Sequence, residues 1–293
     1  MPAFFDEARM RMLIELLAPD RITRIADIGA NPIHVPDYDK LHKIGACEIW
    51  GFEPLPEAFS ALQNAAQPGE HYLPYAIGDG AKGQFHVCAS GGFSSLLLPD
   101  TETLDYLGRW HRAMQVTKQF EVQTHRLDDL GDLPSPDFVK IDIQGGELDV
   151  FQNGREKLKD AVAIVSEVAF AALYTDQPMF FDQARELSDQ GFELNRFLSL
   201  KSKALGSPLM QGLDWRKHQN RLIDGDALFV RRLAAPETWS DEALKHLAIL
   251  ADGVFESFDL CVKCLHILAE RGTVSDPDLG AYLAQVPHQK NGS

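Results

Sequence analysis

An apolar run that ends abruptly at a glycine, within residues 24–32, constrains this chain more than any other stretch. A buried parallel strand followed by a turn has this pattern, and Gly29 lets the backbone of that turn approach a ligand. The next strand candidate, residues 48–54, carries a carboxylate near its end, Glu53. A glycine turn with an acidic residue about 20 positions later is the general plan of a nucleotide-cofactor fold. The two segments therefore predict an α/β sheet with a nucleotide-type cofactor at its carboxyl edge.

The charge and hydropathy of the chain argue against several classes of partner. Its 293 residues include 28 Lys and Arg against 43 Asp and Glu, a net charge of −15, which disfavours binding to nucleic acid or anionic membranes. No stretch reaches the ~18 continuous apolar residues of a membrane span, and the first residues lack the apolar region of a signal peptide. Four cysteines in a chain of this length fit reduced thiols. We therefore expect a cytoplasmic protein with no nucleic-acid or membrane partner.

Strand and helix patterns alternate along most of the chain, which predicts a doubly wound, mostly parallel sheet. After the first two strands, further strands are expected at 71–77, 84–89, 119–125, 137–143, 161–168, 192–198 and 227–232. Helices are expected at 4–17, 56–66, 102–114, from about 147, and at 180–190. From Pro236 onward only helical patterns occur. The predicted division is an N-terminal helix at 1–20, an α/β domain at 21–233 with a lid or substrate loop at 199–226, and a C-terminal helical extension at 234–293.

The turn after Gly29 lacks the glycines that hold a pyrophosphate. The dinucleotide pattern G-x-G-x-x-G needs three glycines, whereas the next glycine after Gly29 is Gly45. S-adenosylmethionine has adenine, ribose and a charged methionine tail but no phosphate, so one glycine is enough, and Asp27 is able to interact with its ammonium group. On this motif alone, an ordinary turn at the end of a strand is the stronger alternative.

Together with residues 139–154 (VKIDIQGGELDVFQNG), the turn resembles the FkbM family of S-adenosylmethionine-dependent methyltransferases. That family pairs D-x-G-A-N with a later K-I-D-[VI]-[EQ]-G-x-E-x-x-[VL] segment, matched here by 27–31 and 140–150. Shorter matches lie at 52–54, 76–79, 94–96 and 127–130. The resemblance covers about 25–232 and implies a seven-stranded, Rossmann-like class I methyltransferase sheet. Two features depart from it: Ile33 stands where the family commonly has a glycine, and the segment after Pro236 has no counterpart in the family core.

The resemblance implies S-adenosylmethionine as the cofactor and assigns its contacts. Glu53 would hold the ribose hydroxyls, because a carboxylate accepts strong, directional hydrogen bonds, and residues 76–79 would border the adenine. Alternatively, Glu53 is a solvated residue at a strand end. No metal ligand is expected. The expected cofactor-binding residues are Asp27, Gly29, Ala30, Asn31, Glu53, Pro54, Ala76, Ile77, Gly78, Ser95, Asp142, Ile143 and Gln144.

Asp142 and Glu167 are the expected catalytic residues. Both fall at the carboxyl ends of predicted strands, where ligands bind in open α/β sheets. Two carboxylates could share a proton, take the proton of an acceptor hydroxyl or bind a divalent ion. Alternatively, Glu167 only marks the exposed end of its strand. Methyl transfer needs mainly in-line alignment, because the sulfonium is already activated, and His34 and His125 are weaker candidates for a base.

Substrate contacts are expected from a basic stretch, residues 201–221, in an otherwise acidic chain. Trp215, Arg216 and His218 lie in it. A lid that binds an anionic or sugar-nucleotide acceptor and a solvated loop fit this composition equally well. Glu147 is a further substrate candidate, although in the first turn of a helix it would also offset the helix dipole.

The C-terminal helical segments carry Cys261 and Cys264 at C-x-x-C spacing. Structural zinc needs a second such pair, and a redox pair would start a helix after a strand, so neither is favoured. The apolar positions of these helices either pack on the domain or form a homodimer face.

The sequence thus predicts an S-adenosylmethionine-dependent methyltransferase. The resemblance implies O-methylation of a hydroxyl on a sugar, glycan precursor or secondary metabolite, so the acceptor is a small molecule or a glycan. One alternative is a non-catalytic, methyltransferase-like interaction module, which the Ile33 departure favours. The other is a nicotinamide-dependent oxidoreductase, against which the missing glycines count.

Overall fold

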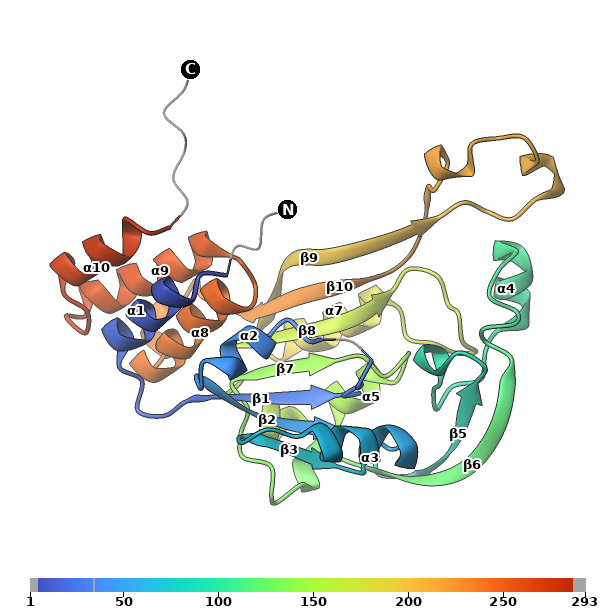
Figure 1. Ribbon diagram of the computed structural model, residues 1–293, viewed down its shortest axis with the longest axis horizontal. Helices are drawn as coiled ribbons and strands as arrows, with labels where there is room; N and C mark the ends of the chain where they lie inside the picture. Colours follow the sequence, from blue (N-terminus) through green and yellow to red (C-terminus); the bar gives the residue numbers. More distant parts are fainter. Residues whose placement is uncertain (1–4, 34, 287–293) are drawn as a thin grey trace.

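A seven-stranded sheet with the strand order β3-β2-β1-β7-β8-β10-β9 forms the centre of the computed structural model, which describes residues 5–33 and 35–286 (Figure 1). Its strands are β1 (Thr23–Ile28), β2 (Cys47–Phe52), β3 (Glu70–Leu73), β7 (Phe138–Ile141), β8 (Ala163–Ala169), β9 (Phe192–Lys203) and β10 (Arg221–Arg231). The first five are parallel, and β10 runs antiparallel to β8 and β9. The predicted doubly wound, mostly parallel sheet is confirmed. Its strand order reverses between β1 and β7, where open α/β sheets bind ligands.

Alternate residues of the strands face two separate cores, so helices cover both faces of the sheet. In β8, for example, Val165 packs in one core and Ile164 in the other. The Val165 face is covered by α1 (Glu7–Leu17), α2 (Asp39–Lys43), α8 (Asp241–Gly253), α9 (Phe258–Glu270) and α10 (Asp276–Leu283). The Ile164 face is covered by α5 (Glu147–Gln152), α6 (Arg155–Leu158) and α7 (Phe180–Asp189). A further helix, α3 (Pro56–Ala65), lies against β3.

The C-terminal helices pack against α1 and the sheet (Figure 1). Arg9 of α1 forms a buried ion pair with Asp252 of α8, with 2.7 Å between Nη2 and Oδ1. Tyr282 of α10 donates to the other oxygen of Asp252, also at 2.7 Å. Of the two sequence alternatives for these helices, packing on the domain is observed, and a homodimer through them stays a prediction.

Cys261 and Cys264 are free, buried thiols within α9. Burial raises the pKa of Cys261 to about 12, which keeps it protonated at neutral pH. Its sulfur lies 3.2 Å from the hydroxyl oxygen of Tyr282. The pair therefore belongs to the helical core.

The largest differences from the predicted boundaries occur in three segments. The strand expected at 71–77 is split, because Pro74 has no N–H to continue the ladder; β4 (Ala76–Ile77) joins a second sheet with β5 (Lys82–Cys88) and β6 (Val116–His125). The helix expected at 102–114 is shorter: α4 (Thr101–Leu107) ends at Gly108, whose φ of 64° is a left-handed cap. The loop expected at 199–226 narrows to 204–220, because β9 and β10 remain paired as far as Lys203 and Arg221.

Candidate cofactor and active site

A cavity lies at the carboxyl ends of β1 and β2, beside the point where the strand order reverses. Its apolar lining suits a flat aromatic ring. The lining residues are Ile28, Gly29, Phe52, Pro54, Tyr75, Ala76, Ile77, Phe85, Leu96 and Ile143. Five of them, namely Gly29, Pro54, Ala76, Ile77 and Ile143, are among the predicted cofactor residues. Tyr75 and Phe85 were not, because they flank or belong to the second sheet, which the sequence analysis did not separate.

Glu53 directly follows β2, between the lining residues Phe52 and Pro54. Its carboxylate is buried, and Oε1 accepts a hydrogen bond from the backbone N–H of Leu55 at 2.7 Å. Burial raises its pKa to about 7. A desolvated carboxylate at the rim of an apolar cavity suits neutral hydroxyl donors such as those of a ribose.

The turn after β1 requires glycine at position 29. Gly29 has φ +85°, and a Cβ there would lie 2.0 Å from the carbonyl oxygen of Asp142. The N–H groups of Gly29 and Ala30 both donate to the carbonyl oxygen of Phe52 at 3.0 Å. These two amides therefore hold the ends of β1 and β2 together and are engaged within the protein.

The departure at Ile33 is absorbed by a local hydrogen bond. Oδ1 of Asn31 accepts from the N–H of Ile33 at 2.8 Å, which is an Asx turn that reverses the chain without a second glycine. The Ile33 side chain is 70% exposed and is not part of the cavity lining. The support that this position gave to the non-catalytic alternative is therefore weakened.

Asp27 is buried at the end of β1 and is already engaged by two neighbours. The hydroxyl of Tyr38 donates to its Oδ2 at 2.5 Å, and Nζ of Lys140 lies 3.2 Å from its Oδ1. Burial alone would lower the pKa of Lys140, but the negative charges of Asp27 and Asp142 outweigh burial and raise this pKa to about 12. Neither partner was predicted from the sequence, although Lys140 lies in the quoted motif and is paired with Asp27 by the register of β1 and β7.

Asp142 and Glu167, the predicted catalytic residues, are brought together by a third side chain. Nε2 of Gln144 donates to Oδ1 of Asp142 at 2.7 Å and to Oε2 of Glu167 at 2.6 Å. Burial, followed by the charges of Asp142 and Glu147, raises the pKa of Glu167 well above its ordinary value. On the far side, Nζ of Lys201 lies 3.5 Å from Oε1 of Glu167 and 2.8 Å from Oδ1 of Asp224.

Two predicted residues, Ser95 and Glu147, are buried and hydrogen-bonded to the backbone of the turn after β7. Oγ of Ser95 donates to the carbonyl oxygen of Gln144 at 2.8 Å. Oε1 of Glu147 accepts from the N–H groups of Ile143 and Gly145 at 3.0 and 3.1 Å, and burial raises its pKa to about 7. Both side chains therefore hold the shape of the turn that carries Asp142 and Gln144.

The remaining predicted residues lie at varying distances from this centre. Gly78 follows β4 and donates its N–H to the carbonyl oxygen of His125, whose ring lies 4.4 Å from that of Tyr75. His34 is outside the described residues. Trp215, Arg216 and His218 are exposed, in the loop joining β9 to β10 (Figure 1), and do not line the cavity. The Arg216 guanidinium lies over the Trp215 ring, 5.2 Å from its centre.

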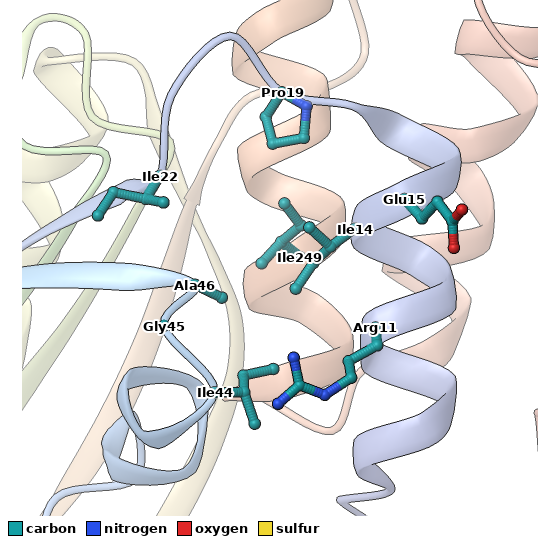
Figure 2. A pocket seen from close by; sticks show the side chains of 9 residues that line it. All are labelled: Arg11, Ile14, Glu15, Pro19, Ile22, Ile44, Gly45, Ala46 and Ile249. Atoms are coloured by element: carbon teal, nitrogen blue, oxygen red, sulfur yellow. The ribbon is translucent and has the colours of Figure 1, made fainter.

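A second cavity lies at the opposite, amino ends of β1 and β2 (Figure 2). Ile14 of α1, Ile44 before β2 and Ile249 of α8 line it, and Arg11 reaches across from α1 toward Ile44. The carboxylate in its lining, Glu15, is exposed, unlike the buried Glu53 beside the first cavity. Within residues 5–33 and 35–286, no group of three or more His, Cys, Asp or Glu is arranged to hold a metal ion. Within the same ranges, no helix has the length and apolarity to span a bilayer.

An apolar cavity with a buried carboxylate at its rim, at the switch point of this seven-stranded sheet, is the arrangement of a Rossmann-like methyltransferase, and this is the class of the protein. Within that class, the chain belongs to the FkbM methyltransferase family, because the family model described as Methyltransferase FkbM domain matches residues 27–194, more than half of the chain. The predictions of a methyltransferase enzyme and of S-adenosylmethionine as its cofactor are thereby confirmed.

Solved methyltransferase structures are similar to the chain at low sequence identity. Precorrin-6y C5,15-methyltransferase from Geobacter metallireducens GS-15 matches at 13% identity and a TM-score of 0.38, over 79% of this chain and 92% of that one. Magnesium protoporphyrin IX methyltransferase (ChlM) from Synechocystis PCC 6803 with bound SAM matches at 11% and 0.37, over 76% and 79%. TYW2 from M. jannaschii in complex with AdoMet matches at 12% and 0.34, over 79% and 78%. No curated protein matches the chain.

Proposed function

We propose that the protein transfers a methyl group from S-adenosylmethionine to a hydroxyl oxygen of a sugar, a glycan precursor or a secondary metabolite. One observation supports this proposal: a pair of carboxylates, Asp142 and Glu167, lies next to the lining of the cofactor cavity. Ile143 lines the cavity, and its neighbours Asp142 and Gln144 are hydrogen-bonded to each other. The side-chain amide of Gln144 also donates a hydrogen bond to Glu167. An unactivated alcohol is a weak nucleophile, so a base beside the methyl donor favours an oxygen acceptor over an already nucleophilic amine.

The residues present fit the cofactor by their chemistry. Glu53 is a buried carboxylate at the cavity rim, suited to the two ribose hydroxyls, and Pro54, Ala76 and Ile77 supply an apolar surface for adenine. When bound, S-adenosylmethionine supplies a methyl group on a cationic sulfur, which leaves as the neutral thioether. Asp27 is the carboxylate proposed to face the methionine end, with Tyr38 and Lys140 fixing its position.

Glu167 is the proposed general base that takes the proton of the acceptor hydroxyl. A carboxylate whose pKa is raised by burial and by the neighbouring charge of Asp142 is a stronger base than an exposed one. The ammonium of Lys201, 3.5 Å from Oε1, favours the ionised form that can accept the proton. The expected pH profile is therefore a methyl-transfer rate that rises as the pH passes upward through the pKa of Glu167.

The substrate contacts proposed at Trp215, Arg216 and His218 depend on movement of the loop 204–220. The support for them is topological: β10 begins at Arg221 and pairs Asp224 with Ala169 at the carboxyl end of β8, so the loop leaves the sheet at the edge where Glu167 lies. The backbone N–H of Gly206 donates to the carbonyl oxygen of Leu107 at 2.9 Å, which joins the loop to α4. A loop anchored at its base, with an exposed aromatic and basic tip, suits a lid over an anionic acceptor.

Calorimetric titration with S-adenosylhomocysteine tests the cofactor, and NAD serves as the comparison. We expect saturable binding of S-adenosylhomocysteine, weakened in Glu53→Ala, and no binding of NAD. Radiolabelled S-adenosylmethionine with paired acceptors, each an alcohol and its matching amine, then tests the reaction. Preferential labelling of the alcohols supports the proposal. Labelling of the amines alone, or absence of S-adenosylhomocysteine binding, contradicts it.

A further inference from the structure

Gln144 adopts a backbone conformation that favours glycine. Its φ is +59°, in the left-handed region, which few residues with a long side chain occupy, and Gly145 follows with φ +108°. Backbone strain of this kind persists where the surrounding structure imposes it, and it clusters at functional sites. A glycine would relieve the strain at position 144, so the presence of glutamine points to a role for its side chain.

All the polar groups of that side chain are engaged. Nε2 donates one hydrogen bond to Oδ1 of Asp142 and one to Oε2 of Glu167, at 2.7 and 2.6 Å. Oε1 lies 3.1 Å from the hydroxyl oxygen of Tyr174, a buried side chain. The single hydroxyl proton of Tyr174 is shared between Oε1 of Gln144 and the carbonyl oxygen of Phe93, which lies 3.0 Å from the same hydroxyl. The carboxylates accept hydrogen bonds, so they fix which end of the amide faces them.

We propose that Gln144 is a positioning residue, which holds the carboxylates of Asp142 and Glu167 together and aims Glu167 toward the acceptor. The proposal rests on the proposed function in taking Glu167 as the base. It assigns the Gln144 side chain to the carboxylate pair, whereas the sequence resemblance implied a cofactor contact.

The chemistry of an amide suits this task. Two neighbouring carboxylates repel each other, and this repulsion either turns them apart or protonates one of them. The two N–H groups of a single amide bind one oxygen of each carboxylate and so stabilise the ionised pair. An amide does not titrate, so it donates at every pH, whereas Lys201 reaches Glu167 from the other side at 3.5 Å. Removing the amide should therefore raise the pKa of Glu167 and let its carboxylate turn.

The backbone of the turn is held independently of this side chain. Ser95 donates to the carbonyl oxygen of Gln144, and Glu147 accepts from the N–H of Gly145. Both contacts survive replacement of Gln144 by glycine. The Gln144→Gly variant therefore removes the amide while it keeps the turn, which separates a positioning role from a structural one.

The experiment compares the full-length protein with Gln144→Gly by three readouts. The carboxyl ¹³C resonance of Glu167, assigned with Glu167→Gln, reports its pKa; we expect a rise of about one pH unit. The melting temperature should stay close to that of the parent, because relief of the positive φ offsets the greater freedom of glycine in the unfolded chain. S-adenosylhomocysteine affinity should stay within about twofold of the parent, because the amide faces the carboxylates. Methyl transfer to the alcohol found in the acceptor screen should fall about 100-fold, as expected for a misplaced base.

Asp176→Gly is the matched control. Asp176 also has a positive φ, of 54°, and it is exposed, so its replacement reproduces the backbone effect and should leave the Glu167 titration unchanged. Tyr174→Phe keeps the amide but removes the hydroxyl next to its oxygen, and should shift the Glu167 pKa in the same direction by less. That variant carries the test if Gln144→Gly does not fold.

Three outcomes overturn the proposal. An unchanged Glu167 pKa with a lower melting temperature would make Gln144 a structural residue. An unchanged Glu167 pKa with lost S-adenosylhomocysteine binding would make it a cofactor contact. An unchanged Glu167 pKa in Tyr174→Phe, where Gln144→Gly is unfolded, also counts against it. If the parent methylates no alcohol, the proposed function fails by itself, and the titration of Glu167 still decides whether Gln144 holds the pair.

Discussion

Gln144 donates a hydrogen bond to Glu167 across 2.6 Å, from the turn after β7 to the neighbouring strand β8. The sheet register explains why residues 23 positions apart meet there. Ile141 of β7 is paired with Ser166 of β8, so the next residues along the two strands are Asp142 and Glu167. Parallel pairing thus places both carboxylates at one edge of the sheet. Gln144 follows in a left-handed backbone conformation, and its side-chain amide lies between the two carboxylates.

Replacing Glu167 by glutamine should remove methyl transfer while it preserves the cofactor site. Glutamine has nearly the same shape but cannot accept the hydroxyl proton, and loss of a general base lowers rates by about 10²–10⁴-fold. We expect S-adenosylhomocysteine to bind as in the parent, because Glu167 does not line the cofactor cavity. Initial rates with labelled cofactor and calorimetry check the two parts. The control is Glu193→Gln, which replaces an exposed β9 carboxylate paired with Arg232 at 3.4 Å. This variant should leave the methyl-transfer rate unchanged. A Glu167→Gln enzyme with a parental rate would exclude Glu167 as the base.

Cofactor binding should depend on pH through Glu53. Burial raises its pKa to about 7 from an ordinary 4.5, and the ionised form is the better acceptor for two hydroxyls. Affinity for S-adenosylhomocysteine should therefore be about tenfold lower at pH 6 than at pH 8.

The effect of pH on folding stability through Glu53 has the opposite direction. In the unliganded protein this carboxyl favours folding below about pH 4.5, and that contribution is lost as the pH rises through 7. Calorimetry and melting curves across this range measure both effects. Glu53→Gln should flatten both profiles, and a pH-independent affinity in the parent would show that Glu53 does not hold the ribose.

Much of the fold and part of the site follow from patterns along the chain. Apolar runs that end at Gly29, Glu53 and Asp142 mark three adjacent strand ends, and the carboxyl ends of parallel strands must meet at one edge. This is why the predicted cofactor residues include half of the cavity lining. The acidic Glu167 was found for the same reason, as a charged residue that interrupts a buried run.

The remaining site residues depend on register and on contacts between distant segments, which periodicity does not encode. Lys140 meets Asp27 because β1 and β7 pair in one particular register. Tyr174 reaches Gln144 from the connection after β8, 30 residues away in sequence. Tyr75 lines the cavity because Pro74 ends β3 and redirects the chain into the second sheet. Each contact depends on where the backbone goes after a strand, and composition does not determine that path.

Gly29→Ala should both destabilise the protein and disturb the carboxylate pair. The added Cβ would lie 2.0 Å from the carbonyl oxygen of Asp142, at a φ of +85°, so the ends of β1 and β7 must separate. We expect a loss of roughly 2–4 kcal/mol in unfolding free energy, with weaker S-adenosylhomocysteine binding. Gly45→Ala is the matched control, because its φ of +75° is similar and nothing lies within 4 Å of the new Cβ; it should cost about 1 kcal/mol. Urea unfolding compares the two. Equal losses would mean that conformational strain alone, and not the close approach to Asp142, requires glycine at position 29.

Asp252→Asn should weaken the attachment of the C-terminal helices without touching the cofactor site. Arg9 and Asp252 are both almost fully buried, 2.7 Å apart, and neutralising Asp252 removes the carboxylate that balances the buried guanidinium charge. A loss of about 3–5 kcal/mol is expected, which corresponds to a melting temperature lower by roughly 10 °C. Glu7→Gln breaks an ion pair of the same helix, with Arg11, in which both side chains are more than half exposed, and should change stability by less than about 0.5 kcal/mol. Differential scanning calorimetry distinguishes these values. Because Asp252 is not among the residues that line the cavity, S-adenosylhomocysteine affinity at 20 °C should be retained. If the affinity fell together with stability, the helical extension would have to be counted as part of the active-site scaffold.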